Sequence, residues 1–172
     1  GIISNHEGIK ADSEIGNNNV YRFDPATGEL SVVVDDFDRP NGLAFSPDES
    51  ELYIADSGYA RGHGFGFEEG RPRHVRGLKV VDGKTLKDSR IVAVINEKVP
   101  DGLRVDTEGL LWISAGDGIH CYTKDGERLG RILVPETVAN LTFGGFGKSR
   151  MFITATSSLY AIETARVGAQ WP

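Results

Sequence analysis

The chain has 172 residues, of which 39% are hydrophobic and 26% charged, values ordinary for a soluble globular domain with room for a core. Its formal net charge of -6 and the lack of any run of like charges argue against a nucleic-acid surface and against a membrane patch. The single cysteine, Cys121, cannot form an internal disulfide, and no apolar run approaches the roughly 20 residues of a membrane span. A cytoplasmic protein is predicted, and because the chain begins at Gly1 without a methionine, its true N-terminus is expected to lie upstream.

Residues 1–18 are rich in Gly, Asn and charge and have no sustained period, which predicts a long loop. Alternation then predicts strands at 19–24 and 30–34, with a turn at 25–28 between them. These two strands are interpreted as the outer half of a blade, covering 1–38, whose inner strands are absent.

A complete four-stranded unit is predicted next, over about 39–96, with strands at 42–46, 51–55, 76–81 and 90–95. Between its second and third strands lies the loop 57–75, which holds five glycines and the basic cluster of Arg71, Arg73, His74 and Arg76. Loops of this length inside compact domains are usually functional or mobile.

The following unit, about 97–136, is more compact, with strands expected at 102–105, 111–115, 119–123 and 128–134. Asp-Gly pairs at 117–118 and 125–126 are typical of hairpin turns that need a positive φ. A partial last unit, 137–172, offers strands at 141–143, 151–155 and 158–162 and no convincing fourth strand. Almost every segment is therefore strand or turn.

A recurring motif organises these units. The sequence RPNGLAFSPD at 39–48 returns as VPDGLRVD at 99–106 and, in weaker form, as VANLTF at 138–143. Each copy is followed by a second apolar strand, and such strand pairs are typical of radial repeats with four short strands per repeat. The predicted fold class is all-β, a partial β-propeller of about three and a half blades of four-stranded antiparallel sheets.

Asn41 and Asp101 fall at the same point of the repeat, each one residue before a glycine. Because the inner strands of a propeller begin at one face, these two side chains are expected to converge on the channel mouth. An amide oxygen and a carboxylate are hard ligands that suit Ca²⁺, Mg²⁺ or Mn²⁺. Both residue types are also common before glycine in tight turns, so a hydrogen-bonding role in a turn stays open for each.

Five further side chains are candidates for contacts with a substrate or for support of the site. Asp56 and Asp117 each follow a second strand and would approach the same face from neighbouring loops, unless they are turn carboxylates. Arg71, Arg73 and His74 would overhang the site and contact a hydroxylated or anionic substrate, unless they are solvated or paired with nearby acids.

Other polar residues are given structural roles. His120 sits in no ligand spacing, so a surface or packing role is expected for it. Ser57 and Ser114 lack the context of a catalytic triad, which argues against a serine hydrolase.

Three segments of the chain support a family resemblance: NNNVYRFDPATGELSVVVDDFDRPNGLAFSPDESELYIADSG, VPDGLRVDTEGLLWISAGDGIHCYTKDGERLGRILVPE, and VANLTFGG followed by MFITATSSLYAI. They are similar to the C-terminal portion of the gluconolactonase and senescence-marker-protein family, also called regucalcin-like. The similarity covers nearly the whole chain, and its RPNGLAFSPD and PDGLRVD motifs are quite specific.

The resemblance implies a six-bladed propeller that hydrolyses sugar lactones with a divalent metal at the channel mouth. Ca²⁺ is the first choice, with Zn²⁺, Mg²⁺ or Mn²⁺ as alternatives. In the family the metal is held by a first-blade glutamate, the asparagine of the RPNG motif and the aspartate of the PDG motif, and the last two correspond to Asn41 and Asp101. The glutamate, and an asparagine of an earlier blade that touches substrate, have no counterpart in this sequence.

The function predicted from these features is the C-terminal part of a metal-dependent, gluconolactonase-like hydrolase. A polarised lactone carbonyl would be attacked by water activated by Asp101. An inactive fragment and a non-catalytic propeller that binds a partner or a carbohydrate are the alternatives. The chain alone is expected to bind metal weakly and to open lactones poorly. Its open sheet faces would be covered by missing N-terminal blades or by another copy.

Overall fold

The computed structural model describes residues 11–61 and 66–169, which form antiparallel strands joined by turns. Within these ranges the one helical element is a 3₁₀ turn at Phe146–Lys148. The loop expected at 1–18 lies in large part outside the described residues.

Four main sheets follow one another along the chain, and each keeps its strands in sequence order. The first pairs β1 (Val20–Phe23) with β2 (Leu30–Val34). The second contains β3 (Pro40–Phe45), β4 (Glu51–Asp56), β7 (His74–Val81) and β8 (Thr85–Val94). The third contains β9 (Leu103–Val105), β10 (Leu111–Ala115), β11 (Gly118–Tyr122) and β12 (Arg128–Leu133). The fourth contains β13 (Val138–Gly144), β14 (Arg150–Ala155) and β15 (Leu159–Glu163).

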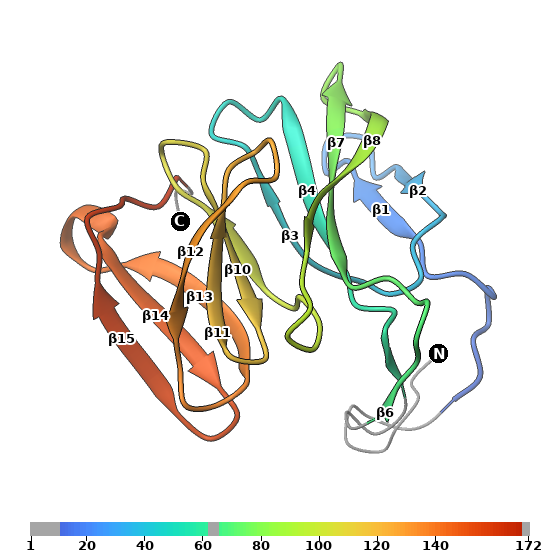
Figure 1. The fold of residues 1–172 in the computed structure, drawn as a ribbon. Coiled ribbons are helices and arrows are strands. Elements are labelled where there is room, and N and C mark those ends of the chain that lie inside the picture. The colour runs from blue at the N-terminus through green and yellow to red at the C-terminus, as the bar shows by residue number, and fades with distance from the viewer. Residues whose placement is uncertain (1–10, 62–65, 170–172) are drawn as a thin grey trace.

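The first strands of the three larger sheets lie beside one another. Strand β9 contacts β3 on one side and β13 on the other. Figure 1 shows the sheets side by side in chain order, from β1 and β2 in blue to β14 and β15 in orange and red. This arrangement of antiparallel sheets around a shared set of inner strands confirms the predicted all-β propeller fold.

Backbone hydrogen bonds between the inner strands reproduce the repeat register. The N–H of Gly42 donates to the carbonyl of Asp101 (3.0 Å), and the N–H of Gly102 donates to the carbonyl of Ala139 (2.8 Å). The same bond therefore joins equivalent positions of successive blades. An alanine stands in the fourth sheet where the second and third sheets place Asn41 and Asp101. Only two of the three repeats thus present a side-chain oxygen at this point.

The apolar core consists of three layers, each between two neighbouring sheets. In the second sheet, Leu52 and Ile54 pack toward the first sheet, whereas Tyr53 packs toward the third. Strand β4 is consequently buried on both faces, which explains its near-continuous apolar sequence in place of alternation. Met151 and Ile153 pack against the third sheet from the fourth.

Two segments differ from the sequence prediction. Strand β8 begins at Thr85 rather than at 90, because Asp82 and Gly83 form a hairpin turn with left-handed φ values of 54° and 61°. The loop 57–75 contains a short hairpin of β5 (Ala60–Arg61) and β6 (Gly66–Phe67), although 62–65 lie outside the described residues.

The C-terminal end of the described chain returns to the third sheet. The N–H of Thr107 donates to the carbonyl of Val167 (2.8 Å), and the N–H of Ala169 donates to the carbonyl of Val105 (3.1 Å). Within the described residues the fourth sheet has three strands.

Gly102→Ala is expected to lower the free energy of unfolding by about 1–3 kcal/mol, because overpacking a close contact has that typical cost. A Cβ at this position would overlap the Asn140 side chain and lie 2.8 Å from the Asn140 Cα. Urea unfolding measures the change. Gly130→Ala is the control, since its Cβ would meet no described atom within 4 Å and should shift stability by less than about 1 kcal/mol. Equal losses in both variants would contradict the close approach of β9 and β13.

Candidate metal and substrate site

Asn41 and Asp101 meet where strands β3 and β9 begin. The bond between Gly42 and the Asp101 carbonyl draws the two segments together. Burial raises the pKa of the Asp101 carboxyl, and a hydrogen bond from the Asn41 side chain opposes that rise. The two side chains therefore converge as the repeat register predicts, while their role as metal ligands stays a prediction.

Ser57 connects the Asn41 side chain to the backbone that precedes Asp101. Its hydroxyl accepts a hydrogen bond from Asn41 Nδ2 (3.2 Å) and donates to the carbonyl of Pro100 (2.5 Å). On the other side, Ser114 Oγ accepts the backbone N–H of Asp101 (3.1 Å). Ser57 and Ser114 are both buried, so these two hydroxyls hold the backbone and side chains of the site in place. Sequence reasoning weighed them only as nucleophiles and missed this positioning role.

Asp56 orders the chain as it enters β3. Its carboxylate accepts hydrogen bonds from the backbone N–H groups of Asp38 (3.0 Å), Arg39 (2.8 Å) and Gly58 (3.1 Å). Three backbone N–H groups from two segments thus converge on one carboxylate. Asp56 thus fixes the backbone immediately before Asn41, and its observed contacts are those of a supporting group.

The basic side chains of the long loop gather around a surface pocket of about 370 Å³. Its lining residues are Tyr59, Glu69, Gly70, Arg71, Pro72, Arg73, His74 and Val94. The Arg73 guanidinium lies 4.4 Å from the centre of the Tyr59 ring, a cation–π contact. Arg71 pairs with Glu68 (2.9 Å) and Asp38 (3.2 Å), and burial lowers the pKa of His74. Two arginines and an imidazole at one concave surface suit an anionic or hydroxylated ligand.

The strand register places this pocket at the same end of the second sheet's strands as Asn41. Pro40 pairs with Asp56 across β3 and β4, and Asp56 pairs with His74 across β4 and β7. His74 in turn pairs with Val94 of β8. One row of residues therefore runs from the inner strand out to the pocket.

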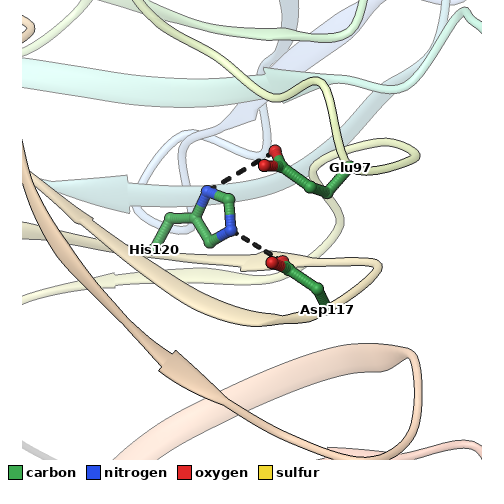
Figure 2. A group of neighbouring side chains, drawn as sticks. All are labelled: Glu97, Asp117 and His120. Atoms are coloured by element: carbon green, nitrogen blue, oxygen red, sulfur yellow. Dashed lines mark hydrogen bonds and ion pairs between the residues drawn. The ribbon is translucent and has the colours of Figure 1, made fainter.

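Asp117 belongs to a different group of side chains. Its Oδ1 lies 2.7 Å from His120 Nε2 and its Oδ2 lies 2.6 Å from Arg131 Nη1. Glu97, Asp117 and His120 form a cluster, drawn in Figure 2, whose ligand atoms all lie within 4.8 Å of one another. The sequence indicated neither the partner of Asp117 nor any polar neighbour for His120.

The sequence profile of the SMP-30/Gluconolactonase/LRE-like region matches residues 4–157. The chain belongs to this family. The resemblance seen in its repeated motifs is thereby confirmed.

Named relatives agree with this assignment. A gluconolactonase of Zymomonas mobilis is 31% identical over 166 residues, which cover 90% of this chain and 43% of that protein. The structure of a gluconolactonase from Xanthomonas campestris is 37% identical with a TM-score of 0.76, over 89% of this chain and 46% of that one. A regucalcin structure from Agrobacterium tumefaciens, at 22% identity and a TM-score of 0.65, covers 81% of this chain and 44% of that one and supports the fold alone. The chain thus spans less than half the length of each of these relatives.

The side chains of Asn41 and Asp101 form a donor set that would fit a hard cation. Asn41 and Asp101 contribute an amide and a carboxylate, and the partly buried carboxylate is a negative charge that a cation would compensate. Two ligands leave coordination positions for water, for substrate and for groups from elsewhere. In the described residues no helix is long and apolar enough to cross a membrane.

Proposed function

We propose that this chain supplies part of the active site of a divalent-metal-dependent sugar lactonase. The observation that supports this most directly is the meeting of Asn41 and Asp101, held by the Gly42–Asp101 backbone bond and by Ser57. Relatives named gluconolactonase, with 31% and 37% identity, favour a lactone as the substrate class.

Asn41 and Asp101 would hold the cation through their side-chain oxygens, with Ca²⁺ favoured by the all-oxygen donor set. When bound, the cation would supply Lewis-acid polarisation of the lactone carbonyl. The Asn41 amide nitrogen donates to Ser57 Oγ at 3.2 Å, and this bond helps to position the side chain, whose carbonyl oxygen is the atom that would serve as the ligand.

Asp101 is the group in this chain that would accept a proton. A water molecule would attack the lactone carbonyl carbon while Asp101 takes one of its protons. The ring C–O bond then breaks, and the proton passes from Asp101 to the leaving ring oxygen to give a hydroxy acid. Burial raises the pKa of Asp101, and a less acidic carboxyl is a stronger base once it is ionised. Ser114, through its bond to the Asp101 N–H, keeps this backbone in register with the site.

The pocket lined by Arg73 and His74, at the same end of the second sheet, would bind the remainder of the substrate. Arg73 and His74 offer hydrogen-bond donors to sugar hydroxyls and to the carboxylate that forms on ring opening. The Tyr59 ring, stacked on Phe67 with centroids 5.1 Å apart, provides a flat apolar surface at the pocket wall.

Metal removal tests the proposal. In a lactone-opening assay of a protein containing this chain, excess EDTA is expected to reduce the rate by at least about 100-fold, because polarisation of the carbonyl is worth several kcal/mol. Added Ca²⁺ should restore the rate. Lactone opening that persists unchanged in EDTA would contradict a metal-dependent reaction. Binding of sugars without any turnover would favour the alternative of a non-catalytic propeller.

A further inference from the structure

A buried histidine outside the Asn41–Asp101 site has one nitrogen without a partner. His120 on β11 is fully buried, and its Nε2 is 2.7 Å from Asp117 Oδ1. Among the described residues its Nδ1 finds no hydrogen-bond partner, although it points at Glu97 Oε2, 4.0 Å away. Figure 2 shows the imidazole between the two carboxylates.

The hydrogen bond to Asp117 determines which nitrogen has the proton. An ionised carboxylate can only accept, so Nε2 is the donor and, in the neutral ring, Nδ1 presents a lone pair. The other oxygen of this carboxylate, Asp117 Oδ2, is paired with Arg131 Nη1 at 2.6 Å. With the ring neutral, two acceptors, Nδ1 and Glu97 Oε2, therefore face each other. Such a pair is stabilised by a cation or a hydrogen-bond donor between them.

The distance between His120 Nδ1 and Glu97 Oε2 is somewhat longer than that between two ligands of one metal ion. Zinc–nitrogen and zinc–oxygen bonds are each about 2.0–2.2 Å long, so two ligand atoms in a tetrahedral shell lie roughly 3.4 Å apart. A hydrogen bond at 4.0 Å would be too long to stabilise the pair. Glu97 has a side chain that is 31% exposed, so it can turn by the small amount that closes the coordination geometry.

We propose that Glu97 and His120 form a second cation site, with His120 Nδ1 and the Glu97 carboxylate as protein ligands and water completing the shell. Asp117 is the hydrogen-bond partner that orients the imidazole, the arrangement that usually accompanies a metal-bound histidine. Imidazole and carboxylate ligands select Zn²⁺, or the similar Co²⁺ and Ni²⁺, over Ca²⁺. The site therefore differs in ligand chemistry from the all-oxygen pair of Asn41 and Asp101.

Two arginines are expected to determine the affinity of this site for a cation. Arg128 and Arg131 lie 3.6 Å and 3.9 Å from Glu97 Oε1, and Arg131 also pairs with Asp117. They neutralise the two carboxylates and repel an added cation, so the affinity is expected to be weaker than that of a closed structural zinc site. Glu97 Oε2, the oxygen turned to the histidine, is the atom left for the metal.

A cation at this site would hold in place the segment that leads to Asp101. Glu97 lies four residues before Asp101, and its backbone carbonyl already accepts the N–H of Gly116 (2.7 Å). A cation held between Glu97 and His120 would fasten this segment to the third sheet by its side chain as well. The predicted role is structural, and it is independent of whether the chain takes part in lactone opening.

Calorimetric titration of the whole chain with Zn²⁺, in excess Ca²⁺ to occupy hard oxygen ligands, tests the proposal. One Zn²⁺ per chain is expected, with Glu97→Gln weakening its affinity at least about 10-fold. Glu97→Gln keeps the size of a partly exposed side chain, so the variant should fold, which its circular dichroism spectrum checks. Asp101→Asn is the matched control and should leave Zn²⁺ affinity unchanged.

Nitrogen NMR of the His120 ring is the second measurement. Zn²⁺ is expected to shift the Nδ1 signal and to leave Nε2 protonated. An unchanged Zn²⁺ isotherm in Glu97→Gln, or loss of binding in Asp101→Asn alone, would overturn the proposal. Absence of stoichiometric Zn²⁺ binding, with Nδ1 found protonated, would overturn it in favour of an imidazolium shared by the two carboxylates.

Discussion

Asp101→Ala is expected to reduce lactone opening by about 10²- to 10⁴-fold, the range that loss of a positioned general base typically produces. The variant loses the carboxylate that would accept the proton of water and one of the two oxygen ligands in this chain. Asn41→Ala should lower Ca²⁺ affinity by less, because it removes a neutral ligand and no formal charge. Calorimetric Ca²⁺ titration and a lactone assay measure both effects in a protein that contains the whole site.

Asp125→Ala is the matched control for Asp101→Ala. Asp125 also precedes a glycine, in an exposed turn between β11 and β12 that lies away from the inner strands. If Asp101 were only a turn residue, the two variants would behave alike in every assay. Unchanged Ca²⁺ affinity and lactone opening in Asp101→Ala, with the fold retained, would assign it to the turn and remove it from the site.

The fold was predictable because it depends on local patterns that repeat. The motifs around Asn41 and Asp101 indicated inner strands, and the structure joins these strands by equivalent backbone bonds. The start of β8 was missed because residues 85–89 contain a single apolar side chain, Leu86, and do not alternate, so only the Asp82-Gly83 turn marks the hairpin.

The candidate site was only partly predictable, because its contacts join distant segments. Repeat position alone brought Asn41 and Asp101 together. By contrast, Ser57 bonds the carbonyl of Pro100 across a separation of 43 residues, and no spacing rule encodes that contact. The meeting of Glu97 with His120 likewise depends on how the segment before β9 packs against β11.

Within the described residues, the inner strand of the second sheet has no inner strand beside it on one side. Leu43, Leu103 and Leu141 occupy the same repeat position, yet their exposed fractions are 46%, 0% and 2%. Leu103 lies beside β3 and Leu141 beside β9, whereas the described residues provide no inner strand before β3. Phe45, on the same face as Leu43, is 41% exposed. Both apolar side chains would therefore be buried if a neighbouring sheet packed against this strand.

The first sheet presents a second apolar face. Tyr21 pairs with Val32 and Phe23 with Leu30, and the four side chains are 44–63% exposed. Contiguous exposed apolar patches on a soluble protein mark interaction sites or association.

The 172-residue chain expressed alone is therefore expected to associate, either with another copy or with chain segments that complete the propeller. In sedimentation velocity runs the chain should form dimers or larger species that dissociate on dilution, with a melting temperature that falls as they dissociate. Replacing Leu43 and Phe45 together by lysine should shift the chain to the monomer, because two charges would then have to be buried at the contact.

Leu133→Lys is the control for that double variant. Leu133 on β12 is 66% exposed, more than either target, but it lies away from β3. It should leave the sedimentation profile unchanged. If Leu133→Lys reduced association by the same amount, association would depend on nonspecific contacts between exposed apolar side chains. A monodisperse wild-type monomer at all concentrations would mean that Leu43 and Phe45 tolerate water, and that a closed ring of blades is not needed to stabilise this half of the fold.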